Sequence, residues 1–363
     1  MTAQNKIDEY YMRCALELAE NGKECSPNPK VGCVIVRDGA IIGQGWHEKC
    51  GEGHAEVNAV RSAGGDIKDA DVYVTLEPCS HYGKTPPCAD MLVQKKPSRV
   101  IAAMTDPNPK VSGKGLQKLS DAGIKVTNGI LKDEAEKINK GFIKRITHGT
   151  PWVTVKCAAS LDGKTALSNG ESKWITCEES LARVHAMRAK NDAILTGIGT
   201  VMADDPELNV RRCDGRDPMR VILDRSLRIS ENAKVLRGGA MIFTSQSADS
   251  RKADMLKAKG AIIERITDGS AFLSEVLHRL AEKGVNYLMV EAGSAVTSSF
   301  IRENLADEFA LFLAPKIIGK GRGICDENEF EKLSCVPKLK DIQYEKSGSD
   351  LLIRGVFECS QDL

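Results

Sequence analysis

Hydrophobic and polar positions follow two different periods along the first part of the chain. Between residues 7 and 20 the apolar positions are 7, 11, 14, 15 and 18, a spacing that predicts a helix ending near Gly22. The apolar runs 31–36 and 40–47 lie on either side of "RDG" and predict a β-hairpin. Further along, apolar runs alternate with helical patterns, which predicts a sheet covered by helices on both faces. We expect strands at 72–76, 99–104 and 124–126, and helices at 54–63, from 88, at 113–123 and at 131–141.

From Pro151 the alternation starts again and predicts a second α/β domain. Its expected strands are 152–160, 193–198, 220–224, 240–245, 261–266, 287–293, 308–318 and 351–357. No long linker rich in proline, glycine or serine separates the halves, so we place the boundary within "THGTP" at 147–151. The sequence therefore predicts two α/β domains, residues 1–148 and 149–363.

Length and charge narrow the class of protein. A chain of 363 residues exceeds what one hydrophobic core usually serves, which also favours two domains. The formal net charge of +1 gives no overall field that would gather nucleic acid or an anionic membrane. No run of about 18 apolar residues occurs, and the N-terminal stretch carries acids where a secretion signal needs an apolar core. We therefore expect a cytoplasmic protein without nucleic-acid or membrane partners.

The cysteine pattern is also typical of a cytoplasmic protein. The twelve cysteines are scattered through a long chain, a pattern that favours reduced thiols, metal ligands and small core residues over a disulfide framework. Cys14, Cys33 and Cys157 sit among apolar neighbours, so we interpret them as packing residues.

Two short motifs in the first half have the residue types of a catalytic metal site. His54 and Glu56 stand at the expected start of a helix, Cys79 follows a strand, and Cys88 follows two prolines that favour a first helical turn. A helix N-terminus favours thiolate, the form that binds metal. One histidine and two cysteines leave the fourth tetrahedral position of zinc for water. His47 and His81 are spare candidate ligands, and Cys50 is more readily a bystander.

Glu56 is not needed as a ligand in such a site, so its carboxylate is free to transfer protons. A carboxylate beside zinc can accept a proton from water and deliver it to a departing amine. Zinc deaminases carry His-x-Glu followed by Pro-Cys-x-x-Cys. Here the second motif is "PCSHYGKTPPC", in which eight residues separate Cys79 from Cys88. The sequence thus predicts a zinc deaminase with an unusual cysteine spacing.

These motifs closely resemble the bifunctional pyrimidine deaminase/reductase family of riboflavin biosynthesis. Residues 7–148 carry its "HAEV", "TLEPCSH", "GKTPPC" and "DPNP" motifs, with the same long cysteine spacing. The resemblance implies a three-layer α/β/α cytidine-deaminase-like domain with His54, Cys79 and Cys88 as zinc ligands and Glu56 as proton shuttle. It also implies that the pyrimidine or its ribose phosphate contacts Asn28, His47, Lys84 and Asn108.

The second half lacks the Gly-x-Gly-x-x-Gly motif of dinucleotide-binding domains. It has glycine-containing turns after strands, at Gly197 and Gly199 and at Gly293, where backbone N–H groups at a helix start could bind phosphate. Such glycines serve turn geometry alone at least as often. Without further information these signals are therefore weak.

The same family resemblance covers residues 151 to about 357 through "KCAASLDGKTA", "GESKWIT", "ILTGIGTVMADDPELNVR", "VEAGS" and "LAPKIIG". It implies a dihydrofolate-reductase-like α/β domain that uses NADPH. The implied NADPH-binding residues are Ala158, Trp174, Thr200, Asp204, Arg225, Gly293, Ser294, Ala295, Val296, Thr297, Ser298 and Ser299. The implied substrate-binding residues are Ser172, Arg188, Leu208, Arg211 and Glu291. Ser294 departs from the proline or glycine frequent in the family.

Lys156 and Asp204 are the titratable residues we expect to assist the reduction of a ribosylamine to a ribitylamine. Each also has an ordinary structural explanation, since Asp204 could form the turn before Pro206 and Lys156 could be a surface strand residue. Arg188 and Arg211 suit bidentate phosphate recognition, although either could be a solvated charge.

The sequence leaves other functions open. A nucleic-acid-editing deaminase shares the zinc motif but would carry Pro-Cys-x-x-Cys and a basic or aromatic path for the strand. A non-catalytic zinc or nucleotide sensor would not need Glu56, and a decayed second domain would leave only deamination. We expect a phosphorylated pyrimidine as the small-molecule substrate, Zn²⁺ and NADPH as cofactors, and assembly as a homo-oligomer.

Overall fold

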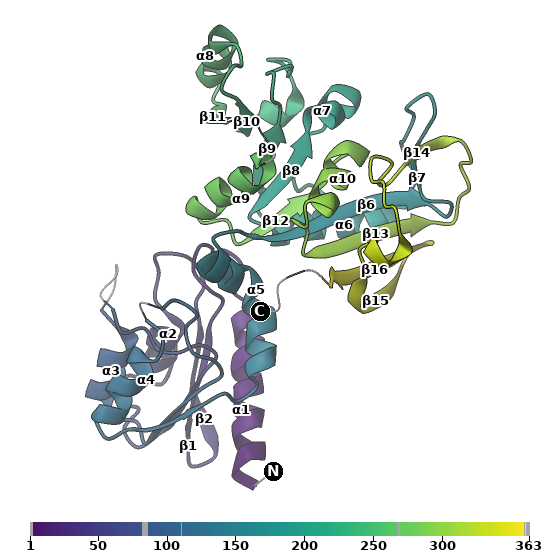
Figure 1. Ribbon diagram of the computed structural model, residues 1–363. Helices are drawn as coiled ribbons and strands as arrows, with labels where there is room; N and C mark the ends of the chain where they lie inside the picture. The colour runs from purple at the N-terminus through teal and green to yellow at the C-terminus, as the bar shows by residue number, and fades with distance from the viewer. Residues whose placement is uncertain are drawn as a thin grey trace. The chain divides into compact units, whose positions relative to one another are not determined.

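The computed structural model describes residues 3–81, 86–109, 111–267, 269, 271–358 and 360. Its backbone divides after Gly149 into two compact units, a division that falls within the segment "THGTP" (Figure 1). Across the described parts of the chain, every helix is too short or too polar to cross a membrane.

The sheet of the first unit contains β1 (Gly32–Arg37), β2 (Ala40–Trp46), β3 (Asp71–Val74), β4 (Arg99–Ala102) and β5 (Lys125–Asn128). The strand order is β2-β1-β3-β4-β5, with β1 antiparallel to β2 and β3, and with β3, β4 and β5 parallel. The carboxyl ends of β3 and β4 therefore lie at one edge, where functional loops of parallel sheets gather.

Helices cover both faces of this sheet. They are α1 (Ala3–Glu20), α2 (Ala55–Ser62), α3 (Cys88–Lys95), α4 (Lys114–Asp121) and α5 (Lys132–His148). Helices α1 and α5 pack on one face, and α2, α3 and α4 pack on the other (Figure 1). At Gly32 an added Cβ would lie 1.9 Å from the carbonyl oxygen of Ala15, so glycine permits the close approach of α1 to β1. The predicted three-layer α/β/α arrangement is confirmed.

The second unit has a long mixed sheet. Its described strand order is β11-β10-β9-β8-β12-β6-β13-β16-β15. The strands from β11 to β13 run parallel, and β16 and β15 add an antiparallel edge. Their bounds are β6 (Trp152–Ser160), β8 (Ala193–Gly197), β9 (Met219–Leu223), β10 (Met241–Ser245), β11 (Ile262–Ile266), β12 (Tyr287–Val290), β13 (Glu308–Ala314), β15 (Leu339–Ser347) and β16 (Asp350–Phe357). A separate ribbon pairs β7 (Lys164–Leu167) with β14 (Gly321–Gly323).

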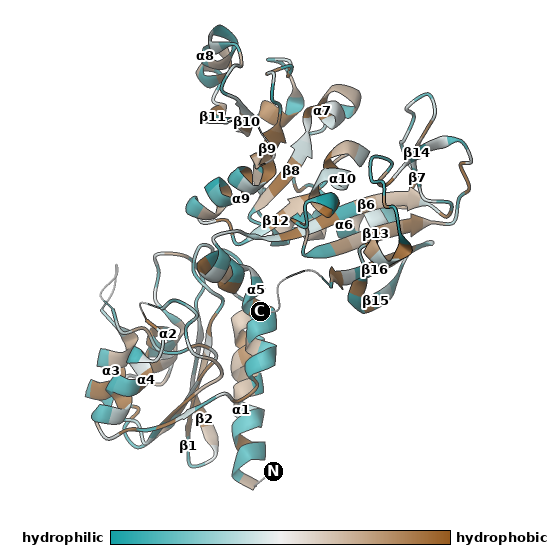
Figure 2. Ribbon diagram, viewed as in Figure 1, coloured by the Kyte–Doolittle hydropathy of each residue, from teal (hydrophilic) through white to brown (hydrophobic). Residues whose placement is uncertain are grey.

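Helices cover this sheet from both sides and enclose separate hydrophobic cores. They are α6 (Glu178–Lys190), α7 (Ile198–Asp204), α8 (Ser250–Ala258), α9 (Phe272–Glu282) and α10 (Ser294–Arg302). Helices α9 and α10 contribute to one core and α7 and α8 to another. Central strands such as β9 are mainly hydrophobic, whereas α8 is mainly hydrophilic (Figure 2). The unit is an α/β domain, as predicted.

Some elements differ from the sequence-based expectation. Helix α1 begins at Ala3 and α5 continues to His148, while β13 ends at Ala314 and not at residue 318. The patterns gave no signal for β7, β14 or β15. Strand β15 lies at an edge of the sheet, and its central residues are exposed and mostly polar, so it lacks the apolar run that reveals a buried strand.

Candidate active sites

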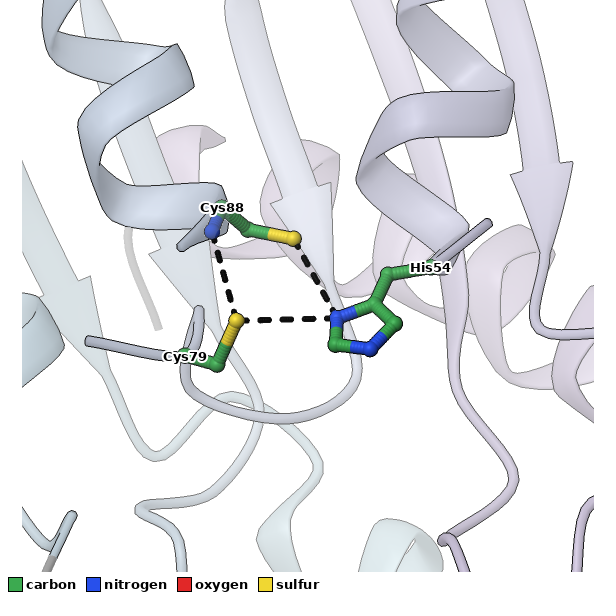
Figure 3. Close-up of side chains that lie close together, drawn as sticks. All are labelled: His54, Cys79 and Cys88. Atoms are coloured by element: carbon green, nitrogen blue, oxygen red, sulfur yellow. Dashed lines mark hydrogen bonds between the residues drawn. The ribbon is translucent and has the colours of Figure 1, made fainter. Parts of the chain in front are cut away.

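The metal site predicted in the first unit is assembled from the ends of three elements. His54 is the residue before α2, Cys79 follows β3, and Cys88 is the first residue of α3. His54 Nδ1 lies 3.5 Å from Cys79 Sγ and 3.4 Å from Cys88 Sγ (Figure 3). The backbone N–H of Cys88 donates to Cys79 Sγ at 3.2 Å, which also favours thiolate there.

These distances fit zinc. With Zn–S of about 2.3 Å and Zn–N of about 2.05 Å, tetrahedral geometry separates sulfur and nitrogen ligands by roughly 3.6 Å. The three potential ligand atoms all lie within 4.8 Å of one another. Neither spare candidate, His47 or His81, belongs to this group, although both are among the described residues.

The electrostatics of the two sulfurs also favour a divalent cation. Hydrogen bonds with Cys88 and His54 lower the pKa of the Cys79 thiol, while the hydrogen bond with Cys79 and burial raise the pKa of Cys88 well above its usual range. Two adjacent thiols thus compete for one negative charge. A bound Zn²⁺ removes this competition because it stabilises both thiolates.

Glu56 lies in the first turn of α2 and is only 3% exposed. Burial and the negative charge of Cys79 raise the pKa of its carboxyl to about 7. A carboxyl of this kind can both accept and release a proton near neutral pH. The Glu56 carboxyl interacts electrostatically with Cys79 and His54, so it lies beside the predicted ligand group. Its role as proton shuttle stays a prediction.

His47 and Asn28 lie next to this group. His47 Nδ1 lies 3.2 Å from the carbonyl oxygen of Gly53, which can only accept, so Nδ1 carries the proton. Its Nε2 is then an acceptor for the side-chain amide of Asn28 at 3.1 Å. Burial lowers the pKa of His47, consistent with a neutral ring. The His47 and His54 rings meet edge to face, with centroids 5.6 Å apart.

The other two expected substrate residues of this unit have different outcomes. Asn108 lies in the loop after β4, where its backbone N–H donates to Asp106 Oδ1 at 2.8 Å. Lys84 lies outside the described residues.

In the second unit, Lys156, Arg188 and Glu291 form a buried ionic cluster. Lys156 Nζ lies 3.3 Å from Glu291 Oε1, and Arg188 donates to both carboxylate oxygens at 2.9 and 3.0 Å. Burial would raise the pKa of Glu291, but Lys156 and Arg188 lower it to about 2. Arg188 Nη1 donates to the carbonyl of Asn209 at 3.0 Å. These contacts give Arg188 the role of holding Glu291, which differs from the expected bidentate contact with phosphate.

The expected cofactor residues lie around the N-terminus of α10 and a nearby pocket. Gly293 precedes this helix, and its N–H donates to Thr200 Oγ1 at 3.1 Å. Ser294 Oγ accepts from the N–H of Asp326 at 2.8 Å. A pocket of about 610 Å³ is lined by several predicted residues together with Arg228 and Arg302. The predicted lining residues are Arg225, Ala295, Val296 and Ser299.

Arg225 is positioned by an aromatic ring. Its guanidinium carbon lies 4.5 Å from the centroid of Phe272. Such stacking orients the planar guanidinium while leaving its N–H groups available at its edge. Thr297 and Ser298, further along α10, are buried.

The remaining predicted residues of this unit are dispersed. Asp204 ends α7 and pairs with Lys173 at 3.6 Å, and the carbonyl of Trp174 accepts from Lys316. Leu208 is 3% exposed and packs in a hydrophobic core. Arg211 bonds Asn209 Oδ1 at 2.7 Å. Ala158 lies on β6, and Ser172 is partly buried in the loop before α6.

Comparisons with known proteins identify the family of both units. The family model "Cytidine and deoxycytidylate deaminase zinc-binding region" matches residues 5–104, and "RibD C-terminal domain" matches residues 151–353. The riboflavin biosynthesis protein RibD of Bacillus amyloliquefaciens is 43% identical over 98% of both chains. The chain belongs to the RibD family. RibD of Escherichia coli K12 is 41% identical over 95% of this chain and 98% of its own.

Solved RibD structures have the same fold over the whole chain. RibD of Acinetobacter baumannii superposes with a TM-score of 0.90 at 41% identity, covering 97% of this chain and 99% of its own. The deaminase/reductase of Thermotoga maritima gives 0.86 at 37% identity, covering 98% of this chain and 99% of its own.

The predicted function is confirmed at the level of this family. The chain is a bifunctional deaminase and reductase of riboflavin biosynthesis, with Zn²⁺ and NADPH as cofactors. The hypotheses of a nucleic-acid-editing deaminase and of a non-catalytic sensor are not favoured, because RibD relatives match both units together.

Two polar residues near the metal site had no predicted role. The side chain of Asn58 donates to the carbonyls of Trp46 and Gly53 and so fixes the loop that leads to His54. Glu77 is buried and accepts four backbone N–H groups, two from the loop after β4 and two from the first turn of α4. Its position in "TLEPC", directly after an apolar strand, was the available sequence signal.

Proposed function

We propose that residues 1–148 hydrolyse 2,5-diamino-6-(5-phosphoribosylamino)pyrimidin-4(3H)-one at its 2-amino group, and that residues 149–363 then reduce the ribosyl side chain to ribityl with NADPH. The printed name of the Thermotoga maritima relative, a diaminohydroxyphosphoribosylaminopyrimidine deaminase/5-amino-6-(5-phosphoribosylamino)uracil reductase, supports this order of reactions. The observation that carries the deaminase assignment is the group of His54, Cys79 and Cys88 beside buried Glu56.

In the deamination, water adds to the carbon that bears the amino group, and that carbon ends as a carbonyl while ammonia leaves. His54, Cys79 and Cys88 would hold Zn²⁺, which supplies a water acidic enough to attack at neutral pH. Glu56 takes the proton of the attacking water and delivers it to the departing amine. Asn28 and His47 orient the pyrimidine, with the His47 ring neutral.

In the reduction, the ribose ring opens to an iminium ion as the sugar oxygen accepts a proton, and the iminium carbon then accepts a hydride to give the ribitylamine. NADPH supplies the hydride, and Gly293 to Ser299 with Arg225 would bind it. Glu291 stays ionised at neutral pH and holds Lys156 Nζ in the site, so Lys156 is the proposed proton donor. Asp204 is the second candidate for proton transfer, and Arg211, Ser172 and Leu208 would contact the sugar phosphate.

The test supplies the diaminopyrimidine substrate and NADPH and follows ammonia and the absorbance of the reduced cofactor together. Glu56→Gln should lower the rate of ammonia release by about 10²- to 10⁴-fold, the usual contribution of a proton-transfer group. The variant should keep its zinc and should still oxidise NADPH when given the deaminated intermediate. Equal ammonia release from both proteins would refute the role of Glu56, and NADPH oxidation without the intermediate would refute the reductase assignment.

We also propose that the protein acts in the cytoplasm, as a homo-oligomer, without nucleic-acid or membrane partners. The described cysteines are free thiols, as in a reducing compartment. Ile342 and Tyr344 are exposed on the edge strand β15, where a second copy could bury them. Light scattering on the eluted protein should give a mass above that of one chain, and a monomer at micromolar concentration would contradict the assembly.

A further inference from the structure

Glu77 connects the loop that carries a predicted zinc ligand to the loop that carries a predicted substrate residue. It stands two residues before Cys79 and is 3% exposed. Its Oε2 accepts the N–H groups of Asp106 at 3.1 Å and Gly113 at 2.9 Å. Its Oε1 accepts those of Gly115 at 2.8 Å and Leu116 at 3.4 Å. One carboxylate therefore holds both ends of the segment from Asp106 to Gly113.

Asn108 lies inside this segment, and its backbone is fixed on both sides. Its N–H donates to Asp106 Oδ1, and its carbonyl accepts the N–H groups of Val111 and Ser112 at 2.8 and 2.9 Å. These hydrogen bonds constrain the backbone of Asn108. The placement of this segment relative to the metal ligands depends on what holds its ends, and Glu77 contacts both ends.

A second contact connects the same two loops. At Gly115 an added Cβ would lie 2.0 Å from the carbonyl oxygen of Pro78, so the first turn of α4 lies directly against the chain between Glu77 and Cys79. The N–H of Glu77 donates to the carbonyl of Met104 at 2.9 Å, at the point where the second loop begins. The two loops are therefore held in register at several points, with the carboxylate at the centre.

We propose that Glu77 is a positioning residue of the deaminase, which sets the distance between the substrate contact Asn108 and the zinc ligands. This inference rests on the proposed function of the first unit. Glu77 has no part in bond breaking in this scheme. Its effect on the reaction passes through Asn108, because a displacement of about 1 Å in a substrate-positioning group can lower a rate by about 10²-fold.

The test compares Glu77→Gln with Glu77→Asp, and Glu20→Gln, at an exposed position of α1, serves as the control. Glutamine keeps the shape of the side chain but turns an N–H group toward backbone donors, whereas aspartate keeps both acceptor oxygens. We expect Glu77→Gln to lower kcat/KM for ammonia release by about 10- to 100-fold, mainly through KM. Glu77→Asp should lose less, and Glu20→Gln should match the native protein.

Three further measurements distinguish positioning from general damage. Zinc content and the reductase rate should be unchanged in Glu77→Gln, and its effect should not add to that of Asn108→Ala, because both remove the same contact. A kcat/KM within twofold of the native value, additive effects, or a loss of activity proportional to a loss of zinc would each overturn the proposal. If Glu77→Gln does not fold, the double-mutant cycle with Asn108→Ala is made with Glu77→Asp. A zinc-loaded native protein that releases no ammonia would instead refute the proposed function itself.

Discussion

Replacement of Glu291 by glutamine should destabilise the second unit strongly, because it removes the only negative charge from the described contacts among Lys156, Arg188 and Glu291. Lys156 and Arg188 are 9% and 8% exposed, so they would remain buried without a counter-charge. Removing one partner of a buried ion pair usually costs about 3–5 kcal/mol. The lowered pKa of Glu291 gives a similar value for this free-energy cost.

That pKa is about 2, below the ordinary value of 4.5. At about 1.36 kcal/mol per unit, a difference of roughly 2.5 units corresponds to about 3.4 kcal/mol at neutral pH. Because the folded pKa is the lower one, the stabilisation is present above pH 4.5 and is lost as the pH falls toward 2. At pH 3 it should have decreased to roughly 1.4 kcal/mol.

The assay is urea unfolding followed by tryptophan fluorescence at pH 7 and at lower pH. The fluorescence of buried Trp152 reports on the second unit, and Trp46→Phe in all proteins removes the tryptophan fluorescence of the first unit. Glu345→Gln is the control. Glu345 pairs with Arg183, which lies on α6 like Arg188, but the side chains of Glu345 and Arg183 are both about 40% exposed. Such a surface pair contributes about 0.2–1 kcal/mol. A Glu291→Gln loss as small as the control, or one that grows as the pH falls, would refute the reasoning.

Three other changes have defined outcomes. Gly32→Ala should destabilise the first unit by about 1–3 kcal/mol, because the added Cβ would overlap the Ala15 carbonyl. The control is Gly199→Ala, whose Cβ would have no atom within 4 Å, and thermal unfolding measures both variants. We expect Arg225 to contact the 2′-phosphate, which NADPH has and NADH lacks, so Arg225→Ala should raise KM for NADPH about tenfold without a matching effect on NADH. Equal effects on both cofactors would contradict this contact. Ser294→Ala removes the acceptor for the Asp326 N–H, so KM for NADPH should rise about two- to tenfold while ammonia release is unchanged.

The metal site could be predicted from the sequence because short motifs mark its candidate ligands. His54, Cys79 and Cys88 each stand at the end of an element, and the sheet topology brings those ends together. Glu56 followed from the same motif. Glu77 did not, because its four contacts come from residues about 30 to 40 positions further along the chain, which no local pattern reveals.

The second unit shows the same limit. Its buried strands have apolar runs and were predicted, whereas β15 is exposed at the sheet edge and was not. Arg188 and Glu291 were both expected to bind substrate, but their pairing across 103 positions depends on how α6 packs near the end of β12. Charge type can be read from a sequence, but the partner of a buried charge is decided by the tertiary fold.

The division after Gly149 has a consequence for how the two reactions came to share one polypeptide. Every residue proposed for hydrolysis precedes it and every residue proposed for reduction follows it, and each side has hydrophobic cores of its own. In this proposal, neither reaction uses a side chain of the other unit. Fusion fixes the ratio of the two catalysts at one to one, and two separate genes could encode the same pair of reactions.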